Sequence, residues 1–447
     1  MFIPSRASIK VISGDTKEML YERDSKLLMR PASNMKLLTS ATALHVLGKE
    51  YRFKTSISSD TIPVNGVIEG NLYIKGFANP DLRTADLDTL VARIHKAGIE
   101  RVTGGVVADV SFFDDQYWGA GWQWDDEPTS DAPFLTPLSI NDNCVVVTVS
   151  PGAAAGDSVR VTLEPPTSYV TVINKGTTIA DTVRRPLSIT RLFRQRLNTI
   201  LVEGEFPQNG TPIEEKISVW RPELYTAELL KEALQRRGIV VGPGLEVGQV
   251  PAQNHEIAAH YQRIDSSIVN LNKISDNLTA EMLLKTLDAV MHHSPGSSRG
   301  GLTIINQFLS TFGIDTTSYR IVDGSGLSFY NLVTAEILVK LLYGMQHQTD
   351  IFPLFYESLP IAGVDGSLRN RMKKTPAEAN LRAKTGTISG VSSLSGYVQS
   401  LDGERLIFSM MLQNFASSAR SYQSAQDKIG ALLAGFSRSG LKAQPTH

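Results

Sequence analysis

Residues 33–36 read Ser-Asn-Met-Lys and stand at the start of a stretch with helical spacing of apolar residues. The spacing predicts a helix from Met35, with Gly48 as a suitable stop. A hydroxyl and an amine three residues apart lie on one face of such a helix. The helix N-terminus can stabilise an oxyanion, and a neutral Lys36 could accept the proton of Ser33. The stretch indicates a nucleophilic serine, although a serine that only caps the helix is the plainer interpretation.

Two further polar clusters follow along the chain. Ser275-Asp276-Asn277 directly precedes a helix predicted over 278–291, and Lys384-Thr385-Gly386-Thr387 runs into a predicted β-hairpin. Each has a plainer interpretation, as a helix cap or as a solvated strand beside a turn. Ser139-Ile140-Asn141 competes with 275–277, but it precedes a β-rich run. We prefer 275–277, which opens a helix in the same C-terminal block as Lys384.

In this order, S-x-x-K, S-D-N and K-T-G form the signature of penicillin-binding proteins and class A β-lactamases. The whole chain resembles the class C low-molecular-mass penicillin-binding proteins, the D-alanyl-D-alanine carboxypeptidase/endopeptidase family. The resemblance includes Asp323–Ser328 and Leu359–Leu368. The interval from Ser33 to Ser275 is far longer than in a β-lactamase, and this family is known for two extra domains inserted there. The interval favours a carboxypeptidase.

The resemblance implies a role for each motif residue. Ser33 would attack the carbonyl of the penultimate D-Ala and form an acyl-enzyme, which water then hydrolyses. Lys36 would be the general base, with its pKa lowered by burial and by the nearby cation of Lys384. Ser275 would relay a proton to the leaving amine, while Asn277 would hold the substrate amide and orient Lys36.

The same resemblance implies the substrate-binding residues. Lys384 with Thr385 would bind the terminal carboxylate, and the backbone N–H groups of Ser33 and Thr387 would form the oxyanion hole. Asp126 lies in a long acidic loop that carries three of the four Trp residues. It is the candidate contact for the amino end of a diaminopimelate side chain, although a solvated loop carboxylate is as good an interpretation. The remaining substrate-binding candidates are Gly386, Leu327 and Ile388.

The composition is that of a globular protein without a strong charge bias. The chain has 447 residues, of which 42% are hydrophobic and 20% charged, and its net charge is −1. This balance gives no support to nucleic acid or an anionic membrane surface as a partner. No stretch approaches the ~18 apolar residues of a transmembrane segment. Cys144 is the only cysteine, which excludes an intrachain disulfide, and we predict neither a metal nor an organic cofactor.

The resemblance also implies the fold, an α/β architecture with inserted modules. An antiparallel sheet flanked by helices would form a penicilloyl-serine transferase domain over 1–58 and 262–447. A β-rich domain would occupy 59–83 and 141–261, with a second inserted domain nested in it at 84–140. The site would lie between the sheet and a helical cluster.

The predicted function is that of a serine D,D-peptidase, which would hydrolyse the terminal D-Ala-D-Ala bond of peptidoglycan stem peptides. β-Lactams would be covalent inhibitors. A serine β-lactamase and a non-catalytic peptidoglycan-binding module are the alternatives. Because the family's substrate lies outside the cytoplasm, we expect a periplasmic or other extracytoplasmic location and an export leader absent from this sequence. Cleavage of D-Ala-diaminopimelate cross-links and assembly into a homo-oligomer stay open.

Overall fold

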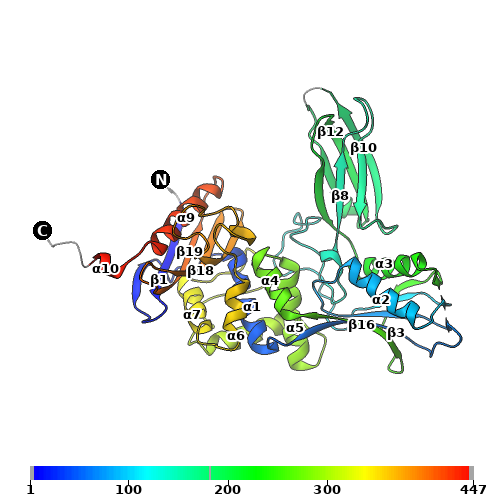
Figure 1. Ribbon diagram of the computed structural model, residues 1–447, viewed down its shortest axis with the longest axis horizontal. Coiled ribbons are helices and arrows are strands. Elements are labelled where there is room, and N and C mark those ends of the chain that lie inside the picture. The colour runs from blue at the N-terminus through cyan, green and yellow to red at the C-terminus, as the bar shows by residue number, and fades with distance from the viewer. Residues whose placement is uncertain (1–4, 181–182, 442–447) are drawn as a thin grey trace. The chain divides into compact units, whose positions relative to one another are not determined.

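The computed structural model describes residues 5–180 and 183–441, which form two compact units (Figure 1). Among these residues, unit 1 contains 5–51, 119–122 and 263–441, and unit 2 contains the remainder. Unit 1 includes all three sequence motifs. The outermost residues of the predicted catalytic domain, at either end of the chain, lie outside the described residues.

Unit 1 is built on a five-stranded antiparallel sheet in the order β17-β18-β19-β1-β2. Strands β1 and β2 come from the start of the chain, and β17, β18 and β19 come from its end. β1 pairs with β19 along its whole length. The bounds are Arg6–Ser13 for β1, Met19–Arg23 for β2, Arg382–Ile388 for β17, Val391–Gln399 for β18 and Arg405–Gln413 for β19.

Helices cover both faces of this sheet. Successive strand residues point to opposite faces. Leu394 and Phe408 pack in a core with side chains of α9 (Arg420–Ala434). Tyr397 donates its hydroxyl to the carbonyl of Leu342 at 2.8 Å, in α7 (Ala335–Met345) on the other face. The centre of the sheet is therefore closed to water on both sides, and the order of strands agrees with the predicted fold class.

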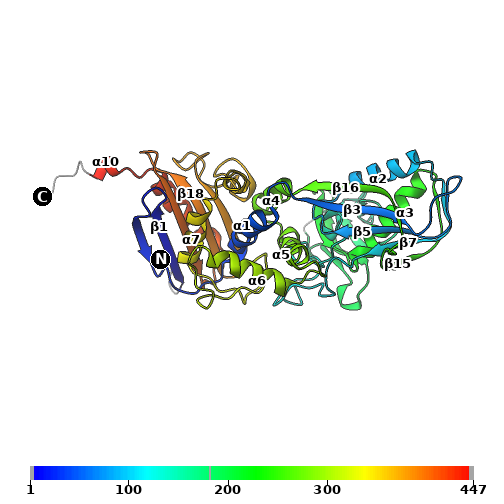
Figure 2. The same cartoon turned by 90° about the horizontal axis from the view of Figure 1, so that it is seen from below.

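The helical cluster of unit 1 surrounds α1 (Met35–Leu47), which ends at Gly48 as predicted. Its first ten residues are buried on all sides, so α1 is a central helix with neighbours on every face. Figure 2 shows α1 between the sheet and α5. The other bounds are Ile264–Lys273 for α4, Asn277–His292 for α5, Ser298–Ser310 for α6, Phe352–Ser358 for α8 and Arg438–Leu441 for α10.

Unit 2 contains a mixed five-stranded sheet and three smaller three-stranded sheets. The large sheet has the order β15-β7-β5-β3-β16, and α3 packs on β7 and β15. Its elements are β3 (Arg52–Ser59), β5 (Leu72–Phe77), β7 (Val106–Asp109), β15 (Leu245–Val247), β16 (His255–Arg263), α2 (Thr84–Lys96) and α3 (Pro222–Arg236). The small sheets consist of β4 (Val67–Ile68), β6 (Arg101–Val102) and β14 (Val240–Val241); β8 (Cys144–Ser150), β9 (Arg160–Glu164) and β13 (Ile213–Ser218); and β10 (Thr171–Ile179), β11 (Ser188–Arg191) and β12 (Thr199–Pro207).

The segments predicted as separate inserted domains share a hydrophobic core. Strands β6 and β7, from the segment 84–140, pair with β4 and β5, from the segment before it. One cluster of buried residues includes side chains from both segments and from the β-rich remainder. The division of unit 2 into two nested domains stays a prediction.

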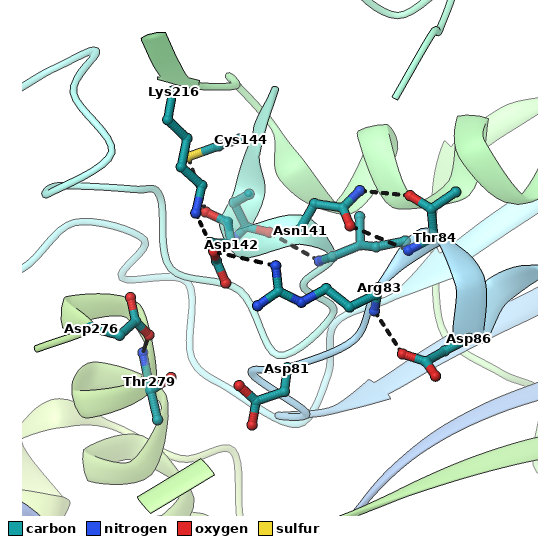
Figure 3. A network of polar contacts seen from close by, with 12 residues as sticks. Asp81, Arg83, Thr84, Asp86, Asn141, Asp142, Cys144, Lys216, Asp276 and Thr279 are labelled. Atoms are coloured by element: carbon teal, nitrogen blue, oxygen red, sulfur yellow. Dashed lines mark hydrogen bonds and ion pairs between the residues drawn. The ribbon is translucent and has the colours of Figure 1, made fainter. Parts of the chain in front are cut away.

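A polar network joins the start of α2 to the region before β8 in unit 2 (Figure 3). Asp142 pairs with Lys216, and Arg83 Nη1 lies 3.8 Å from Asp142 Oδ2. Asn141 donates to the hydroxyl of Thr84 at 2.8 Å. These contacts hold residues 141 and 142 against the start of α2 and against β13. In the part of the chain that the structure covers, no helix is both long and apolar enough to cross a bilayer.

The N-terminus of α7 gives a test of this fold. The side-chain oxygen of Thr334 accepts a hydrogen bond from the backbone N–H of Ile337 at 3.1 Å. Thr334→Ala removes this acceptor and should lower the free energy of unfolding by about 1 kcal/mol, whereas Thr334→Ser retains it and should cost less. Urea unfolding followed by circular dichroism measures both variants, and equal losses would contradict the assigned cap.

Candidate active site

Ser33 lies in a single 3₁₀ turn, Ala32–Asn34, which runs directly into α1. Ala32 has φ 47°, in the left-handed region that residues other than glycine rarely adopt. The N-cap residues of the turn and of α1 are Pro31 and Asn34. Ser33 therefore does not cap the helix, and the plainer interpretation of this serine is wrong.

Lys36 is fully buried and its amine faces three oxygens. Nζ lies 3.0 Å from Ser33 Oγ, 2.5 Å from Asn277 Oδ1 and 2.8 Å from the carbonyl oxygen of Ser325. Carbonyl oxygens only accept hydrogen bonds, so Asn277 and Ser325 together account for both N–H groups of a neutral amine. The lone pair of that amine is then left for the hydroxyl of Ser33.

Ser275 occupies the sharp turn between α4 and α5. Its φ of 69° is again in the left-handed region. Asp276, and neither Ser275 nor Asn277, caps α5: its carboxylate accepts a hydrogen bond from the backbone N–H of Thr279 at 2.7 Å (Figure 3). Ser275 and Asn277 are thereby left on either side of the cap with their side chains available for other contacts.

The third motif lies in strand β17, next to Ser33 of the first motif and Ser275 of the second. The buried Lys384 donates to Ser275 Oγ at 2.8 Å and to the carbonyl of Thr385 at 3.1 Å. A Cβ at Gly386 would lie 2.9 Å from the backbone nitrogen of Ser33. Only glycine lets the strand pass this close to the nucleophile candidate. The structure therefore brings together the five predicted catalytic side chains, those of Ser33, Lys36, Ser275, Asn277 and Lys384.

Burial and charge act together on the two lysines. Burial, followed by the charge of Lys36, holds the pKa of Lys384 well below its usual 10.5. Two ammonium groups this deep in the protein would repel each other, and desolvation disfavours the charged form of each. The arrangement therefore favours a pair in which at least one of the two amines is neutral.

The other predicted residues of unit 1 lie in β17, except Leu327, which lies in the segment 323–328. Thr385 Oγ1 is 2.6 Å from the hydroxyl of Ser367, Thr387 is exposed, and Leu327 and Ile388 are half-buried. Ser367 was not singled out from the sequence, although it belongs to the Leu359–Leu368 block. Across the described residues, no group of three or more His, Cys, Asp or Glu side chains could hold a metal ion.

Asp126 lies in unit 2, unlike the other predicted site residues. Its Oδ2 accepts a hydrogen bond from the backbone N–H of Gln123 at 2.8 Å. Burial, and with it the nearby carboxylates of Asp125 and Asp131, raises the pKa of Asp126. A contact between Asp126 and a substrate stays a prediction.

The competing Ser139 also lies in unit 2, in an internal hydrogen-bond network. Its hydroxyl donates to the carbonyl of Thr136 at 3.0 Å and accepts from Asn143 Nδ2 at 3.1 Å. These contacts fit a structural role for Ser139.

Sequence reasoning missed the groups behind Lys36. The carbonyl of Ser325 contacts the amine directly, and Asp323 and Glu281 hold the backbone around it. The D-G-S-G-L-S block, 323–328, is part of the family resemblance, but the resemblance gave it no contact with Lys36.

Comparisons with known proteins place the chain in a family. A model of the D-Ala-D-Ala carboxypeptidase 3 (S13) family matches residues 4–435. A D-alanyl-D-alanine carboxypeptidase of Actinomadura sp. (strain R39) is 35% identical over 96% of this chain and 81% of its own length. D-alanyl-D-alanine carboxypeptidase DacB of Haemophilus influenzae is 26% identical over 90% of this chain and 84% of its own.

The fold of this chain is also found in a solved structure. The crystal structure of penicillin binding protein 4 (dacB) from Haemophilus influenzae matches with a TM-score of 0.86 and 24% identity, covering 97% of each chain. This likeness confirms the predicted fold class, and the family match confirms the resemblance. The chain belongs to the D-Ala-D-Ala carboxypeptidase 3 (S13) family and is a serine-type D-alanyl-D-alanine carboxypeptidase.

Proposed function

We propose that the protein removes the terminal D-Ala from peptidoglycan stem peptides through an acyl-enzyme on Ser33. The observation that carries the proposal is the amine of Lys36, 3.0 Å from Ser33 Oγ. Two carbonyl oxygens, of Asn277 and Ser325, already accept its N–H groups. The lone pair is therefore directed at the hydroxyl that must lose a proton.

Acylation follows from this geometry. Lys36 takes the proton of Ser33, and Oγ attacks the carbonyl carbon of the penultimate D-Ala. The backbone N–H groups of Ser33 and Thr387 donate to the oxyanion, and one such donor is typically worth about 10²–10³ in rate. Ser275, which lies beside Lys384, passes its proton to the amine of the leaving D-Ala and receives the proton that Lys36 took, so the C–N bond breaks and Lys36 is neutral again.

The third motif binds the substrate. Lys384 and Thr385 hold the terminal carboxylate, and Ser367 positions the hydroxyl of Thr385 through their 2.6 Å contact. Gly386 keeps the strand against Ser33, so the peptide is held with its scissile bond near the nucleophile. Leu327 and Ile388 line the path of the peptide on this side.

Hydrolysis of the ester completes the cycle. Lys36 accepts a proton from a water molecule, which attacks the acyl carbon, and the proton returns to Ser33 as the ester C–O bond breaks. The shortened peptide then leaves. The substrate belongs to the cell wall, so the protein acts outside the cytoplasm, and in a cell with an outer membrane its place is the periplasm.

β-Lactams acylate Ser33 by the same route. The amide of the lactam ring takes the place of the scissile bond, and its opened ring stays attached and blocks the approach of water. A structure of penicillin binding protein 4 (dacB) from Haemophilus influenzae was solved in complex with a β-lactam. A long-lived adduct on this chain separates a D,D-peptidase from a β-lactamase, which would hydrolyse it quickly.

Loss of the nucleophile gives the primary test. Ser33→Ala should abolish both the release of D-Ala from a D-Ala-D-Ala pentapeptide and covalent labelling by a fluorescent penicillin, because no oxygen is left to form the ester. Intact-mass measurement and peptide mapping of the wild-type adduct should place it on Ser33. Undiminished labelling of Ser33→Ala would contradict the assignment.

The two S-x-N candidates serve as a matched pair in the same assays. Ser275→Ala should lower kcat, because the proton path to the leaving amine is broken. Ser139→Ala should leave kcat unchanged, because Ser139 has hydrogen bonds inside unit 2. The reverse pattern would assign the second motif to residues 139–141.

The lowered pKa of Lys384 predicts an alkaline limit to activity. Its ammonium loses the proton as the pH rises through this pKa, which lies well below 10.5, and attraction for the substrate carboxylate is lost. The value of kcat/KM should therefore fall before the pH reaches the range of an ordinary lysine. A peptide with a C-terminal amide should show a weaker fall. A flat profile up to pH 10.5 in folded enzyme would contradict this role.

Asp126 is proposed to bind the free amino group of the diaminopimelate side chain in the stem peptide. Asp126→Asn should lower kcat/KM about tenfold for peptides with that amino group, because a charge-assisted hydrogen bond is lost. Peptides without the group, and the rate of labelling by penicillin, should be unaffected. The neighbouring exposed Asp125→Asn is the control, and equal effects of the two variants would argue against a specific contact.

A further inference from the structure

The turn 323–328 is fixed to the helix that carries Lys36. The carbonyl of Ser325 accepts from Lys36 Nζ at 2.8 Å, and the carbonyl of Gly324 accepts from the hydroxyl of Thr39 at 2.7 Å. Lys36 and Thr39 are both in the first turns of α1. Two successive carbonyls of the turn therefore point at α1, and one of them contacts the amine.

The turn also lies against the residue before the nucleophile. Gly326 has φ 85°, and a Cβ at this position would lie 1.9 Å from the carbonyl oxygen of Ala32. No other residue fits there without moving the turn or Ala32. A shift of the turn would therefore change the position of Ser33 as well as that of Lys36.

One buried carboxylate holds the far side of the turn. Asp323 Oδ1 accepts from the backbone N–H of Gly326 at 2.8 Å and from Asn331 Nδ2 at 2.7 Å. Its Oδ2 accepts from the backbone N–H of Ser328 at 2.7 Å and from Trp122 Nε1 at 3.2 Å. Both oxygens are used as acceptors, which is the hydrogen-bonding pattern of a carboxylate.

A second buried carboxyl group holds the near side. Glu281 lies on α5, one turn after Asn277, and its Oε1 accepts from the backbone N–H groups of Gly324 at 2.9 Å and Ser325 at 2.8 Å. Burial, followed by the charge of Asp323, raises the pKa of Glu281 to about 8. At neutral pH this carboxyl group therefore holds a proton.

We propose that Asp323 and Glu281 are positioning residues for Lys36. Together they fix four backbone N–H groups of the turn 323–328 and so hold the Ser325 carbonyl where it engages one N–H of the amine. With that N–H engaged, the lone pair faces the hydroxyl of Ser33. The inference rests on the proposed function, because it concerns proton transfer from Ser33 to Lys36.

Three variants test this role. Glu281→Gln keeps an oxygen acceptor and matches the uncharged acid, so kcat should stay within about threefold of the wild type. Glu281→Leu removes the acceptor, and Asp323→Asn replaces one accepting oxygen by an N–H donor. In both, kcat should fall about 10²-fold, because the amine is misplaced. KM should change by less than about twofold, because Lys384 and Thr385 bind the carboxylate from β17.

The readout separates positioning from folding. Active enzyme is counted by the end-point of labelling with a fluorescent penicillin, and kcat is expressed per labelled site. A lowered Tm with unchanged kcat per labelled site would show a structural role only and would overturn the inference. An increase in KM that accounts for the whole loss would also overturn it. If Asp323→Asn does not fold, the contrast between Glu281→Gln and Glu281→Leu decides alone.

Failure of this inference differs from failure of the proposed function. A wild-type protein that neither releases D-Ala nor labels at Ser33 would contradict the proposed function. An active wild type with Glu281→Leu and Asp323→Asn at wild-type kcat would contradict the positioning role alone.

Discussion

Burial of two primary amines is the constraint around which unit 1 is organised. An amine taken out of water is unfavourable unless oxygens replace the solvent. Lys36 faces three oxygens and Lys384 two. These oxygens come from the turn before α1, from α5 and its preceding turn, from 323–328 and from β17. The folded unit must therefore hold four separate parts of the chain within hydrogen-bond distance, and this requirement gives the site its geometry.

The backbone around the site shows the same requirement. Ala32 and Ser275 both have left-handed φ values, each next to or at a proposed catalytic residue. Gly386 and Gly326 stand where a Cβ would collide with Ser33 or Ala32. Such conformations persist only where surrounding contacts stabilise them, and the helical cluster and the sheet supply those contacts. The sheet and helices thus support local geometry that the short segments would not adopt alone.

The sequence predicted the site well where side-chain types carried the information. Helical spacing from Met35 to Gly48 was enough to place α1, and three short motifs were enough to name the side chains that meet around Lys36. Helical spacing did not predict that the three motifs lie close together in the folded chain. That prediction came from the family resemblance. The cap of α5 was not foreseen, because the left-handed φ of Ser275 moves the cap to Asp276.

Other features had no local signal in the sequence. The Ser325 carbonyl is a backbone group, which any residue would supply, so its contact with Lys36 depends on tertiary structure alone. The assignment of 119–122 to unit 1 depends in the same way on distant partners, since Trp122 donates to Asp323 far along the chain. Long-range hydrogen bonds of this kind cannot be read from periodicity or residue type.

The pairing of β1 with β19 has a consequence for biosynthesis. The first strand of the catalytic sheet must wait for the last one, because β19 lies between β1 and the strand that carries Lys384. Translation delivers β19 after all of unit 2, whose strands and helices leave the ribosome earlier as one nearly continuous block. Unit 2 can therefore fold without β19, and a chain that stops short of β19 carries Ser33 and Lys36 without the complete sheet that supports the site.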